Sequence, residues 1–167
     1  EKKRDDLKGQ VLALDKQLTG GGKSFDTSVQ FQDRRSKEQK TVKVTIWIPP
    51  NCDYVRGVVV AHPQFGGFAS HHLVRRVAVR ESLGTMVMPA FSYDGKETLQ
   101  RLDEVFDSIA KKSGHPELRG AAVLTAGLSA SVLAARNVAC ETPDRVFGVV
   151  QTAGGNMHEM PGGGSKL

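Results

Sequence analysis

The sequence predicts an α/β domain: a mostly parallel sheet with helices on both faces, in three layers, and an antiparallel hairpin at the N-terminal edge. Three observations lead to this fold class. Gly57–Ala61 (GVVVA) is an apolar run without polar alternation, as a strand buried on both faces requires. After it, apolar runs alternate with stretches of helical periodicity, the order typical of parallel strands joined by helices. Before it, Thr41–Ile48 is rich in β-branched residues and alternates with a period of two, which indicates a hairpin strand.

The other elements follow from local patterns. Phe25–Phe31 is predicted to pair with Thr41–Ile48, and Pro49 and Pro50 end the second strand. A long helix is predicted where apolar residues recur at helical spacing: Leu99, Leu102, Val105, Phe106 and Ile109, within Gly95–Lys112. The remaining predicted elements, in chain order, are a helix at His71–Leu83, a strand at Thr85–Met88, a strand at Ala121–Thr125, a helix at Ala130–Cys140 and a strand at Val146–Gln151.

The chain divides into three parts by composition. Residues 1–24 are predicted as a polar, helix-prone extension that ends in a glycine-rich loop, residues 25–160 as the α/β domain, and residues 161–167 as a glycine-rich tail. The loop Thr19–Ser24 (TGGGKS) is similar to the end of a phosphate-binding loop. That motif needs a glycine where this chain has Gln17, and a strand before it, so we interpret the segment as a flexible loop.

Composition excludes several function classes. The chain has 23 basic and 18 acidic residues, for a net charge of +5, and 39% hydrophobic residues, which indicates a globular domain. The basic residues are scattered, so no nucleic-acid partner is expected. No stretch reaches the roughly 18 apolar residues that a membrane span needs. The spacing of Cys52 and Cys140 favours neither a zinc site nor a disulfide, and we expect no metal and no other cofactor.

The most informative segment is Gly127–Ser131 (GLSAS), which lies between a predicted strand and a predicted helix. A serine on such a sharp turn has its hydroxyl clear of the sheet, as a nucleophile elbow requires. Small residues at Gly127 and Ser131 allow strand and helix to approach each other. The pattern is G-x-S-x-S, so its last position departs from the usual G-x-S-x-G. Strand-to-helix turns in any α/β protein contain Gly, Ala and Ser, so a turn without catalytic function is the alternative.

A second segment, His62–Gly67 (HPQFGG), follows the first buried strand. The loops after Ala61, Thr125 and Gln151 all lie at the carboxyl ends of the predicted parallel strands, where α/β sheets bind ligands. An acyl-transfer enzyme needs backbone N–H groups directed at the developing oxyanion, and a glycine-containing loop here can supply one.

Taken together, the order of these segments resembles the first two thirds of an α/β-hydrolase. The resemblance covers residues 27–158. Within the superfamily, the chain is most similar to the lipase-like esterases and polyhydroxyalkanoate-depolymerase-type hydrolases. Pro143–Gly148 (PDRVFG) resembles the segment that follows the nucleophile in those enzymes. It implies a small-molecule ester substrate and Ser129 as the acylated nucleophile. It also implies an oxyanion hole made by the N–H of Ala130 and a backbone N–H of Gln64 or Phe65. His62 is implied to support the geometry of that loop.

The catalytic base is less defined. Family triads run serine, acid, histidine along the chain, and the strands that carry the last two are not recognised after Ser129. His158 and Glu159 follow the last predicted strand at its carboxyl end, and His158 is the candidate base. Asp144 lies at the amino end of that strand, away from the expected site.

The other histidines are not expected to act. His71 and His72 would open a helix, where adjacent residues do not share a face, so they do not indicate a metal site. His115 precedes Pro116 in a connecting loop and is interpreted as a surface residue.

The sequence leaves the compartment open. Residues 1–6 are charged without an apolar run after them, so they do not form a signal peptide, although one could have been removed before them. The final Ser165–Leu167 (SKL) is a peroxisomal address when it is terminal, but here it follows a glycine-rich run and is not taken as one.

Two functions remain open from the sequence. The first is a serine hydrolase that acts on carboxylic esters through an acyl-enzyme on Ser129. The second is a non-catalytic or truncated hydrolase-like domain that binds a ligand or partner without turnover. An open edge of the parallel sheet would also allow self-association.

Overall fold

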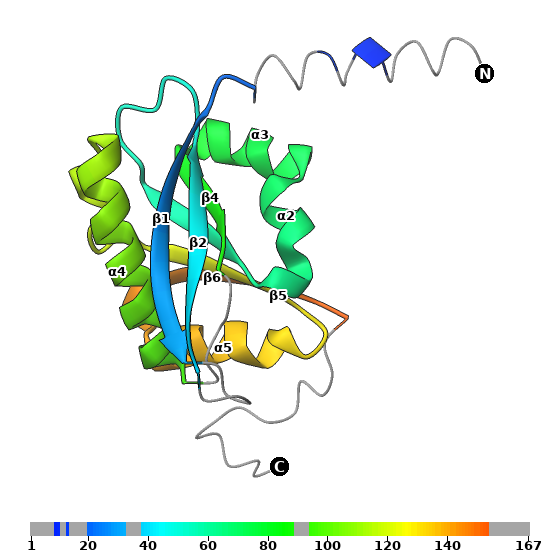
Figure 1. Ribbon diagram of the computed structural model, residues 1–167. Helices are drawn as coiled ribbons and strands as arrows, with labels where there is room; N and C mark the ends of the chain where they lie inside the picture. Colours follow the sequence, from blue (N-terminus) through cyan, green and yellow to red (C-terminus); the bar gives the residue numbers. More distant parts are fainter. Residues whose placement is uncertain (1–8, 11–12, 14–19, 33–37, 89–93, 154–167) are drawn as a thin grey trace.

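A six-stranded sheet forms the centre of the protein in the computed structural model, which describes residues 9–10, 13, 20–32, 38–88 and 94–153 (Figure 1). The strand order is β1-β2-β4-β3-β5-β6. The strands are β1 (Lys23–Gln32), β2 (Gln39–Ile48), β3 (Gly57–Ala61), β4 (Leu83–Val87), β5 (Val123–Leu128) and β6 (Val146–Thr152). The helices are α2 (Gly66–Ser70), α3 (His72–Glu81), α4 (Gly95–Ser113) and α5 (Ser131–Glu141). Short 3-10 helices occupy Pro63–Phe65, Pro116–Leu118 and Pro143–Arg145.

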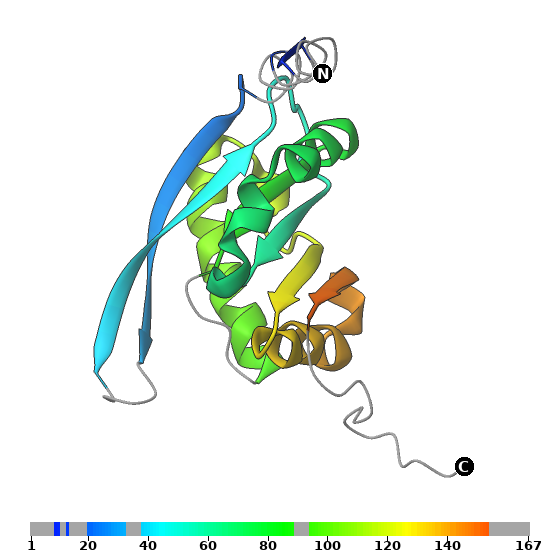
Figure 2. The same ribbon diagram turned by 90° about the vertical axis from the view of Figure 1, so that its right-hand side faces the viewer.

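The sheet confirms the predicted fold class. β3 to β6 are parallel, and β1 and β2 form an antiparallel hairpin that joins β4 at one edge. The chain passes from β3 to β4 on one side of β3 and then crosses back to β5 on the other side. Because such crossovers are right-handed, the reversal of direction places α3 on one face and α4 and α5 on the opposite face. Figures 1 and 2 show this arrangement, with α2 and α3 across the sheet from α4.

The two faces of the sheet are packed differently. The face under α4 and α5 holds the large side chains, among them Val58, Val60 and Met86, together with all five residues of the apolar stripe predicted on α4. Each large side chain that is fully buried stabilises the fold by about 1.5–3 kcal/mol. On the opposite face, Ala61 and Ala126 form a small buried cluster with Ala69 of α2, and Val59 and Trp47 are buried beside it. Because alanines project little, α2 lies close to β3 and β4.

Several predicted boundaries shift for identifiable reasons. The helix predicted to run to Leu83 ends at Glu81, because Ser82 adopts a left-handed conformation (φ 55°) and Leu83 already pairs with Gly57. The strand predicted to end at Thr125 continues to Leu128, because β5 pairs with β6 along that length. The short helix α2 was not predicted.

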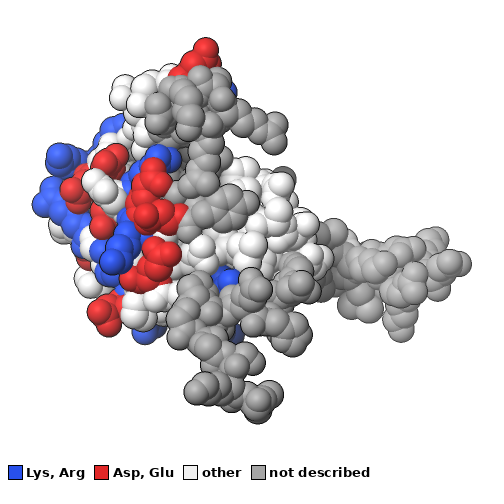
Figure 3. Space-filling model, turned by 90° about the horizontal axis from the view of Figure 1, so that it is seen from below, with Lys and Arg blue, Asp and Glu red and all other residues white. Residues whose placement is uncertain are grey.

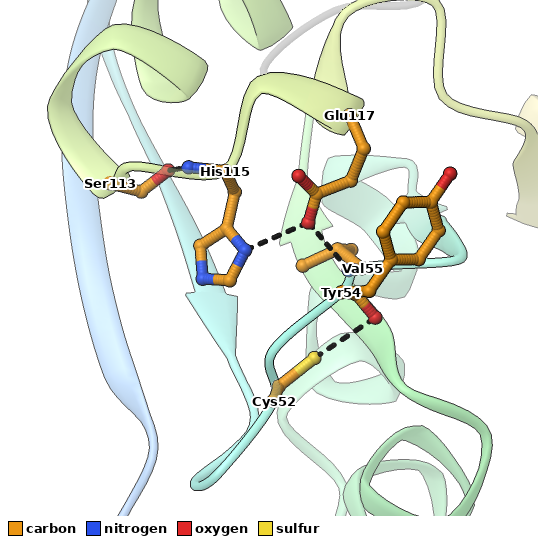
Figure 4. Close-up of polar contacts among 6 residues, drawn as sticks. All are labelled: Cys52, Tyr54, Val55, Ser113, His115 and Glu117. Carbon is orange, nitrogen blue, oxygen red and sulfur yellow. Dashed lines mark hydrogen bonds and ion pairs between the residues drawn. The ribbon is translucent and has the colours of Figure 1, made fainter.

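A partly buried carboxylate fixes the loop between β2 and β3 to the 3-10 helix that follows α4 (Figure 4). Glu117 accepts a hydrogen bond from the backbone N–H of Val55 (2.7 Å) and another from Nδ1 of His115 (2.8 Å). The side chains of His115 and Glu117 are 16% and 10% exposed, so the prediction of His115 as a surface residue was wrong. Cys52 beside them donates to the carbonyl of Tyr54, and burial raises the pKa of its thiol. Both cysteines are free thiols.

The ionisation of Glu117 couples this contact to pH. Burial of the carboxyl group opposes ionisation, but the N–H groups of Val55 and Glu117 and the His115 ring outweigh it, so the pKa of Glu117 lies below its ordinary value. A lowered pKa in the folded state stabilises the fold at pH values above the unfolded pKa. That contribution is lost as pH falls through the folded pKa.

We expect Glu117→Gln to lower the free energy of unfolding by about 1–3 kcal/mol at pH 7, because a charge-assisted hydrogen bond is lost. The difference from wild type should shrink as pH falls below the ordinary glutamate pKa of about 4.3. Urea denaturation at several pH values measures both quantities. Glu104→Gln, at an exposed position of α4, is the control and should change neither. A deficit that stayed constant with pH would contradict the role assigned to the Glu117 charge.

Candidate active site at the β5–α5 turn

Ser129 stands on a tight, strained turn between β5 and α5. Its φ is +54°, in the left-handed region that costs an ordinary residue of order 1 kcal/mol or more, and its side chain is exposed. The Ser129 N–H donates to the carbonyl of Thr152 in β6 (3.0 Å), and its carbonyl accepts from the N–H of Val132 (3.1 Å). Backbone strain of this kind gathers at functional sites.

Gly127 is the residue that makes this turn possible. A Cβ atom at Gly127 would lie 2.6 Å from the carbonyl oxygen of Ser131 and 3.0 Å from Cα of Val132. Real Cβ atoms do not approach backbone atoms so closely, so β5 and α5 could not pack in this way with any other residue there. The sequence predicted this requirement for a small residue.

Ser131 is held inside the turn. It opens α5, is 4% exposed, and its hydroxyl makes two hydrogen bonds with the backbone of Leu128. The hydroxyl accepts from the N–H of Leu128 and donates to its carbonyl, each at 2.8 Å. The serine at the last position of G-x-S-x-S therefore has a structural partner, which the sequence pattern alone did not reveal.

The loop after β3 lies beside this turn. The N–H of His62 donates to the carbonyl of Ala126 in β5 (2.9 Å), so the loop begins next to the strand that carries Ser129. Within the loop, the N–H of Gln64 donates to Nδ1 of His62 (3.2 Å) and the N–H of Phe65 donates to the carbonyl of His62 (2.7 Å). Both N–H groups considered for the oxyanion hole are therefore engaged inside their own turn. The sequence could have indicated this, since a polar residue followed by proline is typical of such a cap.

The protonation state and the tautomer of His62 follow from its surroundings. Burial lowers the pKa of His62, which favours the neutral ring. Because Nδ1 accepts a hydrogen bond, the ring proton resides on Nε2. This agrees with the role in loop geometry that the resemblance implies for His62.

The remaining candidate residues have different positions. Ala130 is the N-cap residue of α5, and its N–H has no hydrogen-bond acceptor among the described residues. No side chain in the described ranges bonds to the Ser129 hydroxyl. His158 and Glu159 lie outside the described residues. Asp144 lies in the 3-10 helix that precedes β6, at the amino end of that strand as expected.

The rings of His71 and His72 stack on each other, although adjacent residues of one helix were not expected to share a face. His71 is the N-cap of α3 rather than part of it, and its extended backbone lets its ring stack on that of His72 at 4.4 Å. Across the part of the chain that the structure describes, no group of three or more His, Cys, Asp or Glu residues could hold a metal ion.

Seen from below, the described surface has no patch made only of basic or only of acidic residues (Figure 3). Figure 3 shows basic and acidic residues interspersed on the side of α4, and few charged residues on the described surface next to them. None of the described helices is both long enough and apolar enough to cross a membrane.

Comparison with known proteins supports the fold and leaves the family undefined by sequence. No protein-family model and no curated protein matches the chain. Solved structures similar to it include lipase A from Candida antarctica (12% identity, TM-score 0.51), with 83% of this chain and 39% of that chain covered. The enterobactin esterase from Shigella flexneri is similar at 14% identity (TM-score 0.52), with 78% of this chain and 37% of that chain covered. A structure of enterochelin esterase from Shigella flexneri is similar at 14% identity (TM-score 0.52), with 84% of this chain and 39% of that chain covered.

These structures are α/β-hydrolase folds, and this chain has the corresponding part of that fold. The chain spans 37–39% of the length of the three similar structures. The likeness lies in the arrangement of strands and helices and does not extend to the chemistry of Ser129.

Replacing Gly127 by alanine tests the close approach of β5 and α5. We expect Gly127→Ala to lower the free energy of unfolding by about 1–3 kcal/mol, because the added methyl group overlaps the Ser131 carbonyl. Gly67→Ala is a matched control, since no atom lies within 4 Å of a Cβ there and alanine favours the helix. Urea denaturation compares the two. Equal stability of both variants would mean that β5 and α5 are less closely packed than described.

Proposed function

We propose that this chain carries the nucleophile part of a serine hydrolase that acts on carboxylic esters through an acyl-enzyme on Ser129. The observation that carries the proposal is the left-handed backbone of Ser129, which holds an exposed hydroxyl at the carboxyl ends of the parallel strands. Two of the structures with a similar fold are esterases, which supports an ester substrate for this chain.

The proposed reaction has two steps. The Ser129 oxygen attacks the ester carbonyl carbon while its proton passes to a base, and the carbonyl oxygen becomes an oxyanion. The oxyanion collapses, the carbon–oxygen bond to the alcohol breaks, and the alcohol leaves with the proton from the base. Water then attacks the acyl-enzyme in the same way, which releases the acid and restores Ser129.

The oxyanion is proposed to receive a hydrogen bond from the N–H of Ala130, the residue after the nucleophile. A second donor would come from Gln64 or Phe65. Because both of their N–H groups donate within their own turn, the loop must release one of them when substrate binds. His158 is the base proposed within this chain.

A second candidate function is a hydrolase-like domain that binds a ligand or partner without turnover. Two observations favour it: no described side chain forms a hydrogen bond with the Ser129 hydroxyl, and the Gln64 and Phe65 N–H groups already donate within their own turn. In this case the turn would have the shape of a nucleophile elbow without an activated serine.

Labelling with a fluorophosphonate probe distinguishes the two functions, because the probe reacts with an activated serine. We expect peptide mass spectrometry to find the label on Ser129 of the folded wild type and none on Ser129→Ala. Ser28→Ala, at an exposed position of β1, should be labelled like wild type. His158→Ala should lower the labelling rate by about 10³-fold or more if His158 is the base. Folded wild-type protein that takes up no label would favour the non-catalytic function.

The open edge of the sheet leads to a separate proposal, that two copies of the chain associate through β6. In the described chain β6 pairs only with β5, its sequence VFGVVQT has no charge and no proline, and Phe147 is 51% exposed. Edge strands without charges or proline are the ones that pair with other chains. β1, at the other edge, carries charged residues such as Lys23 and Asp26.

Sedimentation equilibrium tests this association. We expect a concentration-dependent dimer for wild type and a monomer for Phe147→Lys, because a charge on the edge strand opposes pairing. Tyr54→Lys, which alters another exposed aromatic residue outside β6, should behave like wild type. A wild-type monomer at all concentrations would exclude the association.

A further inference from the structure

Ser131 occupies an unusual place for a polar side chain. It is the first residue of α5 and is 4% exposed, and it stands where the usual motif has a glycine. A buried hydroxyl without partners would destabilise the fold. Its retention at this position therefore depends on the two hydrogen bonds that it makes.

Both of these hydrogen bonds go to one residue. The hydroxyl accepts from the N–H of Leu128 and donates to its carbonyl, each at 2.8 Å. Leu128 is the last residue of β5 and directly precedes Ser129. The hydroxyl therefore joins the end of the strand to the start of the helix, with only Ser129 and Ala130 between them.

Of the two enclosed residues, Ser129 is strained, whereas Ala130 has ordinary helical angles (φ −59°, ψ −28°). Ser129 has its φ at +54°, and rotation of φ to the ordinary negative range would relieve the strain while moving its Cβ and hydroxyl. Two backbone hydrogen bonds, to Thr152 and from Val132, also hold Ser129. Among the described side chains, only that of Ser131 bonds to residues 128–130.

Ser131 does not compete with Ser129 as a nucleophile. Its hydroxyl is buried and already donates its proton to a carbonyl, whereas the side chain of Ser129 is exposed. The two serines of the motif therefore have different environments and different functions.

We propose that Ser131 is a positioning residue of the Ser129 site: its hydroxyl clamps both backbone groups of Leu128 and so keeps Ser129 in the left-handed conformation that presents its own hydroxyl. This inference rests on the proposed function of Ser129. It extends that function to a residue that acts through the turn and does not touch the substrate.

The experiment compares Ser131→Ala with Thr125→Val. Thr125 is a matched control, because its hydroxyl is also buried and also joins β5 to α5, through the carbonyl of Ala135 (2.9 Å), but lies away from Ser129. Both variants lose one buried hydroxyl and should lose similar stability. We expect Ser131→Ala to lower the rate constant of fluorophosphonate labelling, and kcat of ester hydrolysis, by about 10- to 100-fold with little change in KM. Thr125→Val should stay within about threefold of wild type.

Two further variants sharpen the comparison. Ser131→Thr keeps the hydroxyl and should retain the wild-type rate within about threefold. Ser131→Cys replaces the hydroxyl by a weaker donor and acceptor of similar shape, and provides the same comparison if Ser131→Ala does not fold. It should lie between wild type and Ser131→Ala.

A spectroscopic readout makes the result independent of activity. The NMR backbone chemical shifts and the HN–Hα coupling of Ser129 report its φ. They should indicate the left-handed conformation in wild type and in Ser131→Thr, and a shift toward negative φ in Ser131→Ala. Unchanged Ser129 shifts in Ser131→Ala, or an equal rate loss in Thr125→Val, would overturn the proposal. Wild type without label would overturn the proposed function, while the shifts still decide whether Ser131 holds the turn.

Discussion

The close approach of β5 and α5 is the constraint on which the candidate site depends. At Gly127 the two elements come so near that a single methyl group would overlap the Ser131 backbone. A chain that must reverse in so short a distance has few conformations available, and a left-handed residue at Ser129 is the one found here. The exposure of the Ser129 hydroxyl is thus a result of packing between a strand and a helix and does not depend on a long loop. The strain is held by neighbouring contacts: the Thr152 carbonyl on β6 and the Ser131 hydroxyl on α5.

The two faces of the sheet make different contributions. Large side chains under α4 and α5 supply most of the buried apolar surface, and so most of the stability. Under α2, Ala61 and Ala126 of the sheet pack with Ala69 of the helix; these alanines contribute little burial but allow the loop after β3 to come close to β5. The alanines Ala61 and Ala126 directly precede His62 and Gly127, the first residues of the two segments that form the candidate site. Small size at these positions therefore brings together segments that are more than sixty residues apart in the chain.

The fold could be predicted to a large extent because its signals are local. The apolar run at Gly57–Ala61, the helical stripe on α4 and the prolines after Ile48 each determine a neighbouring element, and together they predicted the parallel sheet and the hairpin. The boundaries that moved depend on pairing or on single backbone angles, such as φ at Ser82, which no residue pattern expresses. In the site, the small residues at the turn were predictable from sterics. The hydrogen bonds of Ser131, Gln64 and Phe65 were not, because they depend on the direction of single groups in the folded chain. His115 was misassigned because its partners, Glu117 and the loop at Val55, meet only after folding.

The way the hairpin of β1 and β2 is attached determines where local unfolding of the domain begins. Its two strands pair over their full ten residues, yet β2 joins β4 through only Ile46 and Trp47. The half of the hairpin nearer to Lys23 is also held by α4, through the Thr27–Ser108 hydrogen bond and the contact of Lys112 with Asp26. The far half, toward Gln32 and Gln39, extends beyond the body as a two-stranded ribbon (Figure 2). Its amide protons should therefore exchange with solvent through local opening, at a rate that rises along the ribbon, while β3 and β5 exchange only when the whole domain unfolds.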